Sequence, residues 1–519
     1  MALKNAQIIA CPKNRPYQGL EVGITHKNAQ KKFYTLVKRP VKRLLGFFGG
    51  VGLLLSGESA MAQGFCRPEL AQRVSAIAAR PILTRAHLGL LVETQGPTTA
   101  KRQVILEHNI DQWFVPASTL KLLTTAAALQ QLGPDFQIQT SVRLHQQAQQ
   151  TSLWVIGSGD PTFGDQQLQD LAQQIAQHGV QQVDQLWGYD SYFSGRAVHP
   201  NWEWEDVLAG YGASANGLIL NENALGVTLY PTEIGQPLRV EWADSTQANR
   251  WQVNNTSLTM AQGAPLTADV GRDWSQPILH VFGNLSVDAG PDPFAIAITQ
   301  PGNYFIEQLD QRLGQTGIAV TSAGLTSTLP SPDVSEIATV SSPPLSQWLP
   351  TINQNSNNLY AEALLKSLGI ATEQETDATE AGTEAVKEVL SELGVDPDSY
   401  QMVDGSGLSR HNLLTPRTLV DTLQAMAYNS HSGLYRDSLA VAGQAGNLSH
   451  RFRNTPVQGR LQGKTGYVSN NESLAGYLQP LEHPPLVFSI FLNNADLSAT
   501  EMREIIDEIL LDIAQLQAC

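Results

Sequence analysis

Residues 116–134 read PASTLKLLTTAAALQQLGP, and this stretch decides the fold that the sequence predicts. Pro116 suits the first turn of a helix, where its missing N–H costs nothing, and the closing Gly-Pro pair supplies a stop. The residues between are apolar almost all round, which is typical of a helix in the interior of a domain. The first turn is the exception, because Ser118 and Lys121 stand three residues apart and therefore share one face.

Ser118 and Lys121 form a candidate pair of nucleophile and base. Burial disfavours the charged form of an amine, so a lysine at the mouth of a buried helix can stay neutral and take the serine's proton. The alternative is that Ser118 only caps the helix while Lys121 reaches out to water. An S-x-x-K pattern arises by chance about once or twice in a chain of this length, so the interpretation needs support from elsewhere.

Length and charge set the broad class of protein. The chain has 519 residues, which predicts two or more domains, and its 42% hydrophobic and 16% charged content is typical of a folded protein. Residues 1–62 hold ten Lys or Arg and two Asp or Glu, which leaves 23 basic and 46 acidic residues, a net charge of −23, in the rest. An acidic body of this kind argues against nucleic acid as a partner.

The first 62 residues resemble a secretory leader. Four basic residues within positions 38–43 precede an apolar run at 44–55, and Ala62 ends a small-x-small cleavage site. Twelve apolar residues are too few to span a bilayer comfortably, although a retained N-terminal anchor is the alternative. We therefore expect export to the periplasm, with no clear membrane anchor after cleavage.

The three cysteines lie near the two ends of the chain. Cleavage after position 62 removes Cys11 and leaves Cys66 and Cys519. In an exported protein, two remaining cysteines suggest a disulfide that ties the termini together. Two unrelated free thiols are the alternative, and the sequence leaves this choice open.

Strands and helices from both ends of the chain predict one α+β domain. We expect strands at 86–93, 103–107, 460–468, 473–478 and 486–492, and helices at 68–79, 345–353, 359–367, 379–393, 416–427 and 498–513. The five strands predict an antiparallel sheet flanked by helices. The last helix has one apolar stripe and an acidic opposite face, which favours packing on the sheet over binding to a lipid surface.

The middle of the chain has a different texture. Short alternating segments run from about residue 138 to a Pro/Ser-rich boundary near 340, which predicts a large, mostly β inserted module. We therefore expect the main domain to consist of residues 63–137 and 341–519, with the module at 138–340 between them.

Two further motifs fall in the outer domain. An S-N-N motif at 356–358 begins a helix, and a K-T-G motif at 464–466 lies on the first of the last three strands. The glycine of the second motif permits close approach of a ligand or of another backbone. Taken alone, Ser356 could cap its helix and Lys464 could be an exposed strand lysine. All three motifs in this order and context are far less common by chance than S-x-x-K alone.

In this order the motifs resemble the signature of the penicilloyl-serine transferases, in which the middle motif is S-D-N. In particular, the chain resembles the D-alanyl-D-alanine carboxypeptidase/endopeptidases among the low-molecular-mass, class C penicillin-binding proteins, which carry a large insertion after the first motif. The 234 residues at positions 122–355 fit that arrangement. Further matching segments are GSGDP at 157–161, W-x-W-x-D at 202–206, LNEN at 220–223 and DGSGLSR at 404–410.

The resemblance implies a β-lactamase/transpeptidase-like fold and a role for each motif. Ser118 would be the acylated nucleophile, Lys121 its general base, and Ser356 the group that relays a proton to the departing D-alanine. It also implies two nested subdomains in the insertion, at about 138–166 with 247–340, and at 167–246.

The same resemblance implies how the substrate is held. Asn358 would bind the substrate's peptide group, Lys464 would supply positive potential, and Thr465 would bind the terminal carboxylate beside Gly466. The backbone N–H groups of Ser118 and Tyr467 would form an oxyanion hole, to which the helix dipole contributes.

The roles of two positions, Asp206 and Tyr467, are left open by the resemblance. Asp206 matches a position that meets the free amino end of the diamino acid in the stem peptide, although an ordinary surface or capping aspartate is the alternative. Tyr467 departs from the family, in which threonine usually follows K-T-G, so a hydroxyl near the carboxylate is lost or displaced. The preference between carboxypeptidase and endopeptidase action is therefore open.

The implied substrates are peptidoglycan peptides that end in D-Ala-D-Ala, and the implied inhibitors are β-lactam antibiotics. No metal or cofactor is expected, because the eleven histidines show no zinc-ligand spacing such as H-E-x-x-H. A Ser-His-Asp hydrolase is disfavoured because the chain has no G-x-S-x-G motif. The alternatives are a β-lactamase or esterase on the same scaffold, and a non-catalytic wall-binding scaffold.

Overall fold

The structure is a computed structural model that describes residues 64–519 except 148–149, 333 and 373–376. The leader predicted at residues 1–62, with its cleavage site and Cys11, lies outside the described residues. Within the described part of the chain, no helix combines the length and the apolar character that crossing a membrane requires.

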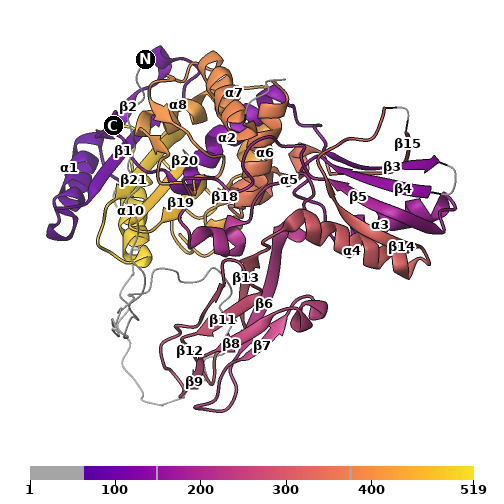
Figure 1. Ribbon diagram of the computed structural model, residues 1–519. Coiled ribbons are helices and arrows are strands. Elements are labelled where there is room, and N and C mark those ends of the chain that lie inside the picture. The colour runs from indigo at the N-terminus through magenta and orange to yellow at the C-terminus, as the bar shows by residue number, and fades with distance from the viewer. Residues whose placement is uncertain (1–63, 148–149, 333, 373–376) are drawn as a thin grey trace, which may run out of the picture. The chain divides into compact units, whose positions relative to one another are not determined.

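The main sheet is antiparallel and joins the two ends of the chain (Figure 1). Its order is β18-β19-β20-β21-β1-β2, and β1 pairs along its whole length with β21. These strands are β1 His87–Thr94, β2 Val104–His108, β18 Ala440–Val441, β19 Leu461–Val468, β20 Asn471–Leu478 and β21 Leu486–Asn493. The five predicted strands are all present. The sixth, β18, has only two residues and so carries no alternation that a sequence pattern could reveal.

The stretch at 116–134 lies in the core on one face of this sheet. It begins as a short 3-10 turn, Ala117–Leu120, and continues as α2, Lys121–Gln131, whose residues 121–129 are all buried. Around it pack α5 Leu345–Asn353, α6 Asn358–Ile370, α7 Ala378–Glu392 and α8 Pro416–Ala427 (Figure 1). The apolar circumference of α2 is thus explained by neighbours on every side.

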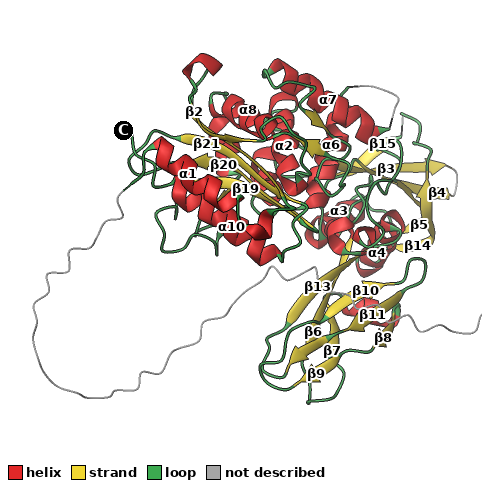
Figure 2. Ribbon diagram, turned by 90° about the vertical axis from the view of Figure 1, so that its left-hand side faces the viewer, coloured by secondary structure: helices red, strands yellow, loops and turns green. Residues whose placement is uncertain are grey.

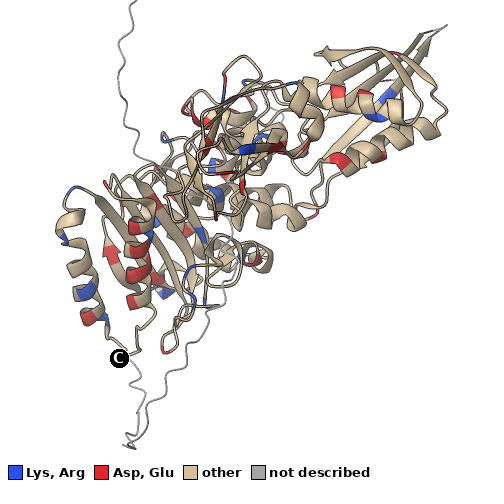
Figure 3. Ribbon diagram, turned by 90° about the horizontal axis from the view of Figure 1, so that it is seen from below, with Lys and Arg blue, Asp and Glu red and all other residues tan. Residues whose placement is uncertain are grey.

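The opposite face of the sheet is covered by α1 Arg67–Ala78 and α10 Ala499–Ile513, which lie side by side in Figure 2. The apolar stripe of α10 is buried, as predicted for a helix that packs on the sheet. Its acidic residues form a row beside the basic residues of α1 in Figure 3, and Arg73 contacts Asp512 at 2.9 Å.

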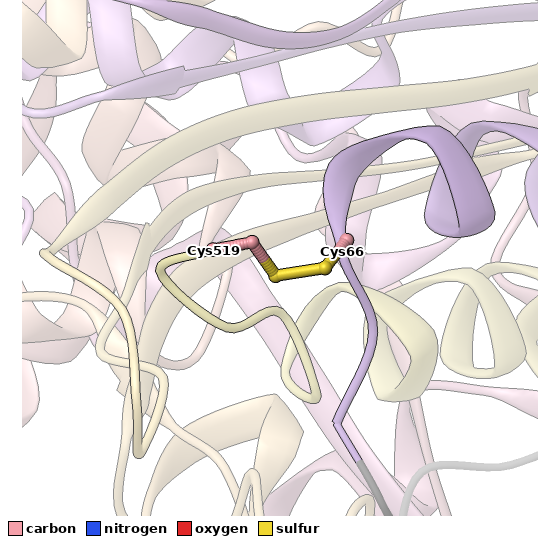
Figure 4. Close-up of a disulfide and its surroundings, with 2 residues drawn as sticks. All are labelled: Cys66 and Cys519. Atoms are coloured by element: carbon pink, nitrogen blue, oxygen red, sulfur yellow. A yellow bond between two sulfur atoms is a disulfide. The ribbon is translucent and has the colours of Figure 1, made fainter.

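The two ends of the chain are also linked covalently. Cys66, just before α1, and Cys519, the last residue, form a disulfide (Figure 4), so the structure makes the choice that the sequence left open. Beside it, Phe65 forms a β-bridge with Leu516.

The insertion contains more helix than the sequence predicted. Its first sheet has the order β14-β5-β4-β3-β15 and carries two helices, α3 Asp165–Gln177 and α4 Pro301–Gln315. The strands are β3 Gln139–Gln147, β4 Gln150–Gly157, β5 Gln182–Tyr189, β14 Ala319–Thr326 and β15 Ser335–Ser341. The apolar residues of α3 recur at helical spacing, but its many glutamines conceal the pattern. Its buried residues are Leu168, Leu171, Ala172 and Ile175.

The strand pairing divides the insertion differently from the borders expected at 166 and 247. Strand β5 pairs with β4 and β14, so residues up to 189 share a sheet with 139–157. The segment 224–297 forms smaller sheets of its own, in the orders β13-β6-β7, β10-β11-β8 and β12-β9. These strands are β6 Ala224–Tyr230, β7 Arg239–Trp242, β8 Gln252–Asn255, β9 Leu258–Met260, β10 Asp269–Arg272, β11 Ile278–Phe282, β12 Asn284–Ser286 and β13 Asp292–Ala297.

Replacing both cysteines, as Cys66→Ser with Cys519→Ser, is expected to lower the free energy of unfolding by about 2–4 kcal/mol. The reason is that a link across 453 residues removes freedom from the unfolded chain. Urea unfolding with and without reductant measures the effect. Reductant should destabilise the wild type and leave the double variant unchanged. Equal unfolding midpoints of the oxidised and reduced wild type would contradict the prediction.

Candidate active site

Two glycines pack closely against the turn that carries Ser118. A Cβ atom at Gly466 on β19 would lie 2.6 Å from the Pro116 carbonyl oxygen and 3.0 Å from the Ser118 nitrogen. A Cβ atom at Gly407 would collide with the Ala117 carbonyl, and Gly407 has a φ of +79°, which also favours glycine. The glycine of the K-T-G motif therefore lets strand β19 lie directly against the Ser118 backbone.

Lys121 is fully buried next to Ser118. Its side-chain nitrogen contacts three oxygens: Ser118 Oγ at 2.9 Å, Asn358 Oδ1 at 2.7 Å and the Ser406 carbonyl at 2.6 Å. Burial lowers the pKa of Lys121 to about 7, against the opposing charges of Asp404 and Glu362. Lys121 does not reach out to water, which excludes the alternative considered from the sequence.

These three oxygens can accept the three N–H groups of a charged Lys121, and they also suit the neutral amine that a base must be. Asn358 donates its Nδ2 to the Tyr211 carbonyl at 2.9 Å, so its Oδ1 is the atom that faces Lys121. The oxygens of Asn358 and Ser406 can only accept, and they take the two N–H groups of an amine. In the protonated form Lys121 donates to Ser118 Oγ; in the neutral form the Ser118 hydroxyl is the one partner able to donate, and the lone pair of the amine then faces its proton.

Ser356 and Lys464 form a second pair. Lys464 is fully buried, and its nitrogen donates to Ser356 Oγ at 2.8 Å and to the Thr465 carbonyl at 2.8 Å. Burial and then the charge of Lys121 lower the pKa of Lys464 well below its ordinary value, although Glu472 opposes this. Lys464 is thus not the exposed strand lysine that the sequence also allowed.

Ser356 does not cap helix α6. Its φ is +63°. This left-handed conformation is unfavourable for any residue that carries a side chain. The cap is the next residue, Asn357, whose Oδ1 accepts from the Tyr360 N–H at 3.2 Å. The hydroxyl of Ser356 is therefore left to face Lys464.

Tyr467 lies on β19 two residues beyond Thr465, and both are half-buried. The ring of Tyr467 packs with the apolar cluster beneath α10, and the Arg503 guanidinium carbon lies 5.4 Å from its centre. Burial raises the pKa of its phenol. This side chain takes no part in the hydrogen bonds among Ser118, Lys121 and Asn358.

Asp206, in the insertion, is buried and is not an ordinary surface aspartate. Its Oδ1 accepts from the Tyr211 hydroxyl at 2.9 Å, and its Oδ2 lies 3.7 Å from Arg410 Nη1. Burial raises the pKa of Asp206, against the Tyr211 hydrogen bond and the Arg410 charge. The Tyr211 carbonyl also accepts from Asn358 of the S-N-N motif. A single residue, Tyr211, therefore connects Asp206 with that motif.

Comparison with known proteins identifies the family. The sequence profile of the D-Ala-D-Ala carboxypeptidase 3 (S13) family matches residues 70–515. The chain belongs to this family. The D-alanyl-D-alanine carboxypeptidase of Actinomadura sp. (strain R39) is 30% identical over 455 residues, 84% of this chain and 82% of that protein. The penicillin-sensitive carboxypeptidase A of Dictyostelium discoideum is 28% identical, over 82% of this chain and 86% of that protein.

The fold agrees with a solved structure. The crystal structure of penicillin binding protein 4 (dacB) from Haemophilus influenzae superposes with a TM-score of 0.73 and 23% identity. It covers 85% of this chain and 98% of that one. The α+β fold class expected from the strands and helices, and the resemblance to D-alanyl-D-alanine carboxypeptidases expected from the motifs, are both confirmed.

Three residues that surround the site of this S13 protein were given no role from the sequence, although Glu222 lies in the LNEN segment at 220–223. They are Tyr211, Glu222 and Glu362, of which Glu222 Oε2 accepts from Asn357 Nδ2 at 2.8 Å. Glu362 did leave a signal, since it is a charged residue one turn after Asn358 in the mostly apolar helix α6. In the part of the chain that the structure describes, no group of His, Cys, Asp or Glu is arranged to hold a metal ion.

The buried Lys121 makes stability depend on pH. Its pKa is about 7 in the folded chain against an ordinary value of 10.5. The unfolded chain therefore binds more protons between these values, so the folded state gains stability as the pH rises from about 7 towards 10.5.

Lys121→Met is expected to remove this gain. Across that interval the free energy of unfolding of the wild type should rise relative to the variant by at most roughly 1.4 kcal/mol per pH unit. Urea unfolding at neutral and alkaline pH measures the difference. Lys387→Met, on the exposed side of α7, is the matched control and should keep the wild-type dependence. Parallel pH curves for the wild type and Lys121→Met would contradict the prediction.

Proposed function

We propose that this S13 protein is a serine-type D-Ala-D-Ala carboxypeptidase that acts on peptidoglycan stem peptides through an acyl-enzyme on Ser118. The observation that carries the proposal is the hydrogen bond between Lys121 and Ser118 in a fully buried setting. A neutral amine with both N–H groups occupied accepts the serine proton as its oxygen attacks the D-Ala-D-Ala carbonyl.

The leaving group needs a proton in return. Ser356 gives its hydroxyl proton to the departing D-alanine nitrogen. The proton that Lys121 took from Ser118 then restores the Ser356 hydroxyl. The hydrogen bond that Lys464 donates to Ser356 Oγ at 2.8 Å stabilises a transient alkoxide there. Water then attacks the acyl-enzyme with Lys121 again as base, which releases the shortened peptide and restores Ser118.

The remaining motif residues bind charge and orient the peptide. Asn358 holds the substrate's peptide group, and Lys464 with Thr465 attracts the terminal carboxylate. The N–H groups of Ser118 and Tyr467 stabilise the oxyanion, and the close packing at Gly466 supports this by bringing β19 against the Ser118 backbone. Such preorganised donors contribute about 3–4 kcal/mol each to catalysis in serine hydrolases.

Substrate, inhibitor and location follow the same proposal. Penicillin binding protein 4 of Haemophilus influenzae has been solved in complex with a β-lactam, and we infer that β-lactams acylate Ser118 here. The basic and apolar leader and the Cys66–Cys519 disulfide support action in the periplasm. The net charge of −23 beyond residue 62 supports a function without nucleic acid.

Asp206 is proposed to bind the free amine of the diamino acid in the stem peptide. Among the described residues, its buried Oδ2 has no hydrogen-bond partner and only the long 3.7 Å contact to Arg410, so a substrate ammonium would supply a partner. Arg410 also contacts Glu203 at 2.8 Å. Arg410 therefore still has one carboxylate partner when Asp206 binds the substrate amine.

A fluorescent penicillin is expected to label the purified mature protein covalently, and Ser118→Ala should abolish the label. Ser391→Ala, at an exposed position near the end of α7, is the matched control and should label as the wild type does. Unchanged labelling of Ser118→Ala would refute the nucleophile assignment. Release of the drug within seconds would instead favour a β-lactamase.

Digestion of isolated peptidoglycan, with the products separated by mass, is the companion experiment. Loss of one alanine shows carboxypeptidase action, and conversion of dimers to monomers shows endopeptidase action. Penicillin binding without either product would favour a non-catalytic scaffold.

Asp206→Asn is expected to lower kcat/KM about tenfold or more for peptides with a free diamino-acid amine, because a buried charged hydrogen bond is lost. The matched control is the same peptide acetylated at that amine, for which the wild type and the variant should agree within about threefold. An equal loss on both peptides would show that Asp206 only supports the structure.

A further inference from the structure

Glu362 is a buried carboxylate that the mechanism above does not use. It lies on α6 one turn after Asn358 and is 3% exposed. Its Oε1 accepts from the backbone N–H groups of Gly405 at 3.0 Å and Ser406 at 2.8 Å. Two successive amides of the loop at 404–410, here called the 404–410 loop, are thus held by one side chain.

The carbonyl groups of the same two residues are bonded to α2. The Ser406 carbonyl accepts from Lys121 Nζ at 2.6 Å, and the Gly405 carbonyl accepts from Thr124 Oγ1 at 2.8 Å. The 404–410 loop therefore lies between α6 and α2, which pack against each other (Figure 1). Glu362 thus holds the N–H groups of the two residues whose carbonyl groups contact α2, and the carbonyl of the second, Ser406, accepts from the Lys121 nitrogen.

Charged groups from several segments surround Glu362. They are Lys366 one turn further along α6, Asp404 in the loop, Arg196 and His199 in the insertion, and Lys121 beyond Ser406. Lys366 in turn faces Asp190 and Asp377 and donates to the Ala215 carbonyl at 2.8 Å.

Burial and then the Asp404 charge raise the pKa of Glu362 to about 7. When ionised, Glu362 favours the charged form of Lys121. The catalytic lysine and the glutamate behind it therefore titrate in the same range of pH.

We propose that Glu362 is a positioning residue for the acylation step. It holds the 404–410 loop so that the Ser406 carbonyl directs the Lys121 lone pair at Ser118, and its negative charge raises the pH at which Lys121 becomes a free base. This inference rests on the proposed function, because it assigns Glu362 a role in the same acylation.

The test is the pH dependence of the second-order rate of acylation by a fluorescent penicillin. Glu362→Gln keeps an oxygen for both loop amides and removes the charge. The acid limb is the part of the pH–rate curve where acylation slows because Lys121 becomes protonated. In this variant the acid limb is expected to move to lower pH by roughly half a pH unit or more. The plateau rate at higher pH should stay within about threefold of the wild type. A residue that only supported the fold would not move the limb in this direction.

Glu362→Asp tests the other half of the proposal. It keeps the charge but is one methylene shorter, so it cannot hold both amides without drawing in the 404–410 loop. The plateau rate should fall about tenfold while the acid limb stays at the wild-type position. This variant keeps the proposal falsifiable if Glu362→Gln does not fold.

Glu93→Gln is the matched control, since Glu93 is another buried glutamate, on β1, hydrogen-bonded to Gln424. Its acid limb should coincide with that of the wild type. If the acid limb of Glu362→Gln also coincides with that of the wild type, while Ser118-dependent labelling is intact, this inference alone is overturned. Absence of Ser118-dependent labelling in the wild type would overturn the proposed function as well.

Discussion

The burial of one lysine nitrogen constrains the whole catalytic domain. Lys121 is inaccessible to solvent, and an unpartnered amine there would cost several kcal/mol. Three oxygens from three segments satisfy it, namely Ser118 in the preceding turn, Asn358 at the start of α6 and Ser406 in the 404–410 loop. A shift of any of these segments breaks a hydrogen bond in the core, so the site is as rigid as the core that surrounds it.

The insertion helps to build this site. The Tyr211 carbonyl orients the Asn358 amide, Glu222 contacts Asn357, and Trp202 donates to Asp404 at 2.9 Å. Asp404 also accepts from two N–H groups of its own loop and from the Asn412 side chain, so its buried charge is fully hydrogen-bonded. Residues of the insertion that lie far from the S-N-N motif in the sequence thereby set the geometry of that motif.

The main sheet explains why the two ends of the chain must meet. Strand β1 near the start pairs with β21 near the end, and β19 in turn presses Gly466 against the Ser118 turn. The Cys66–Cys519 disulfide and the α1–α10 contacts hold the same two ends together on the far face of the sheet. Both ends of the chain therefore contribute to the oxyanion side of the site.

The sequence by itself determined the elements of the main domain and the three motifs, because helical periodicity, strand alternation and exact motif spacing are local properties. It placed the long helices and strands of that domain within a few residues, and Ser118, Lys121, Ser356, Asn358 and Lys464 lie together as the motifs predicted. Only the tertiary structure decided what surrounds them. Helices α3 and α4, the strand pairing inside the insertion, the Asp206–Tyr211 contact and the place of Glu362 depend on contacts between residues far apart in the chain. Such contacts are set by packing and buried charge, which no single stretch of sequence records.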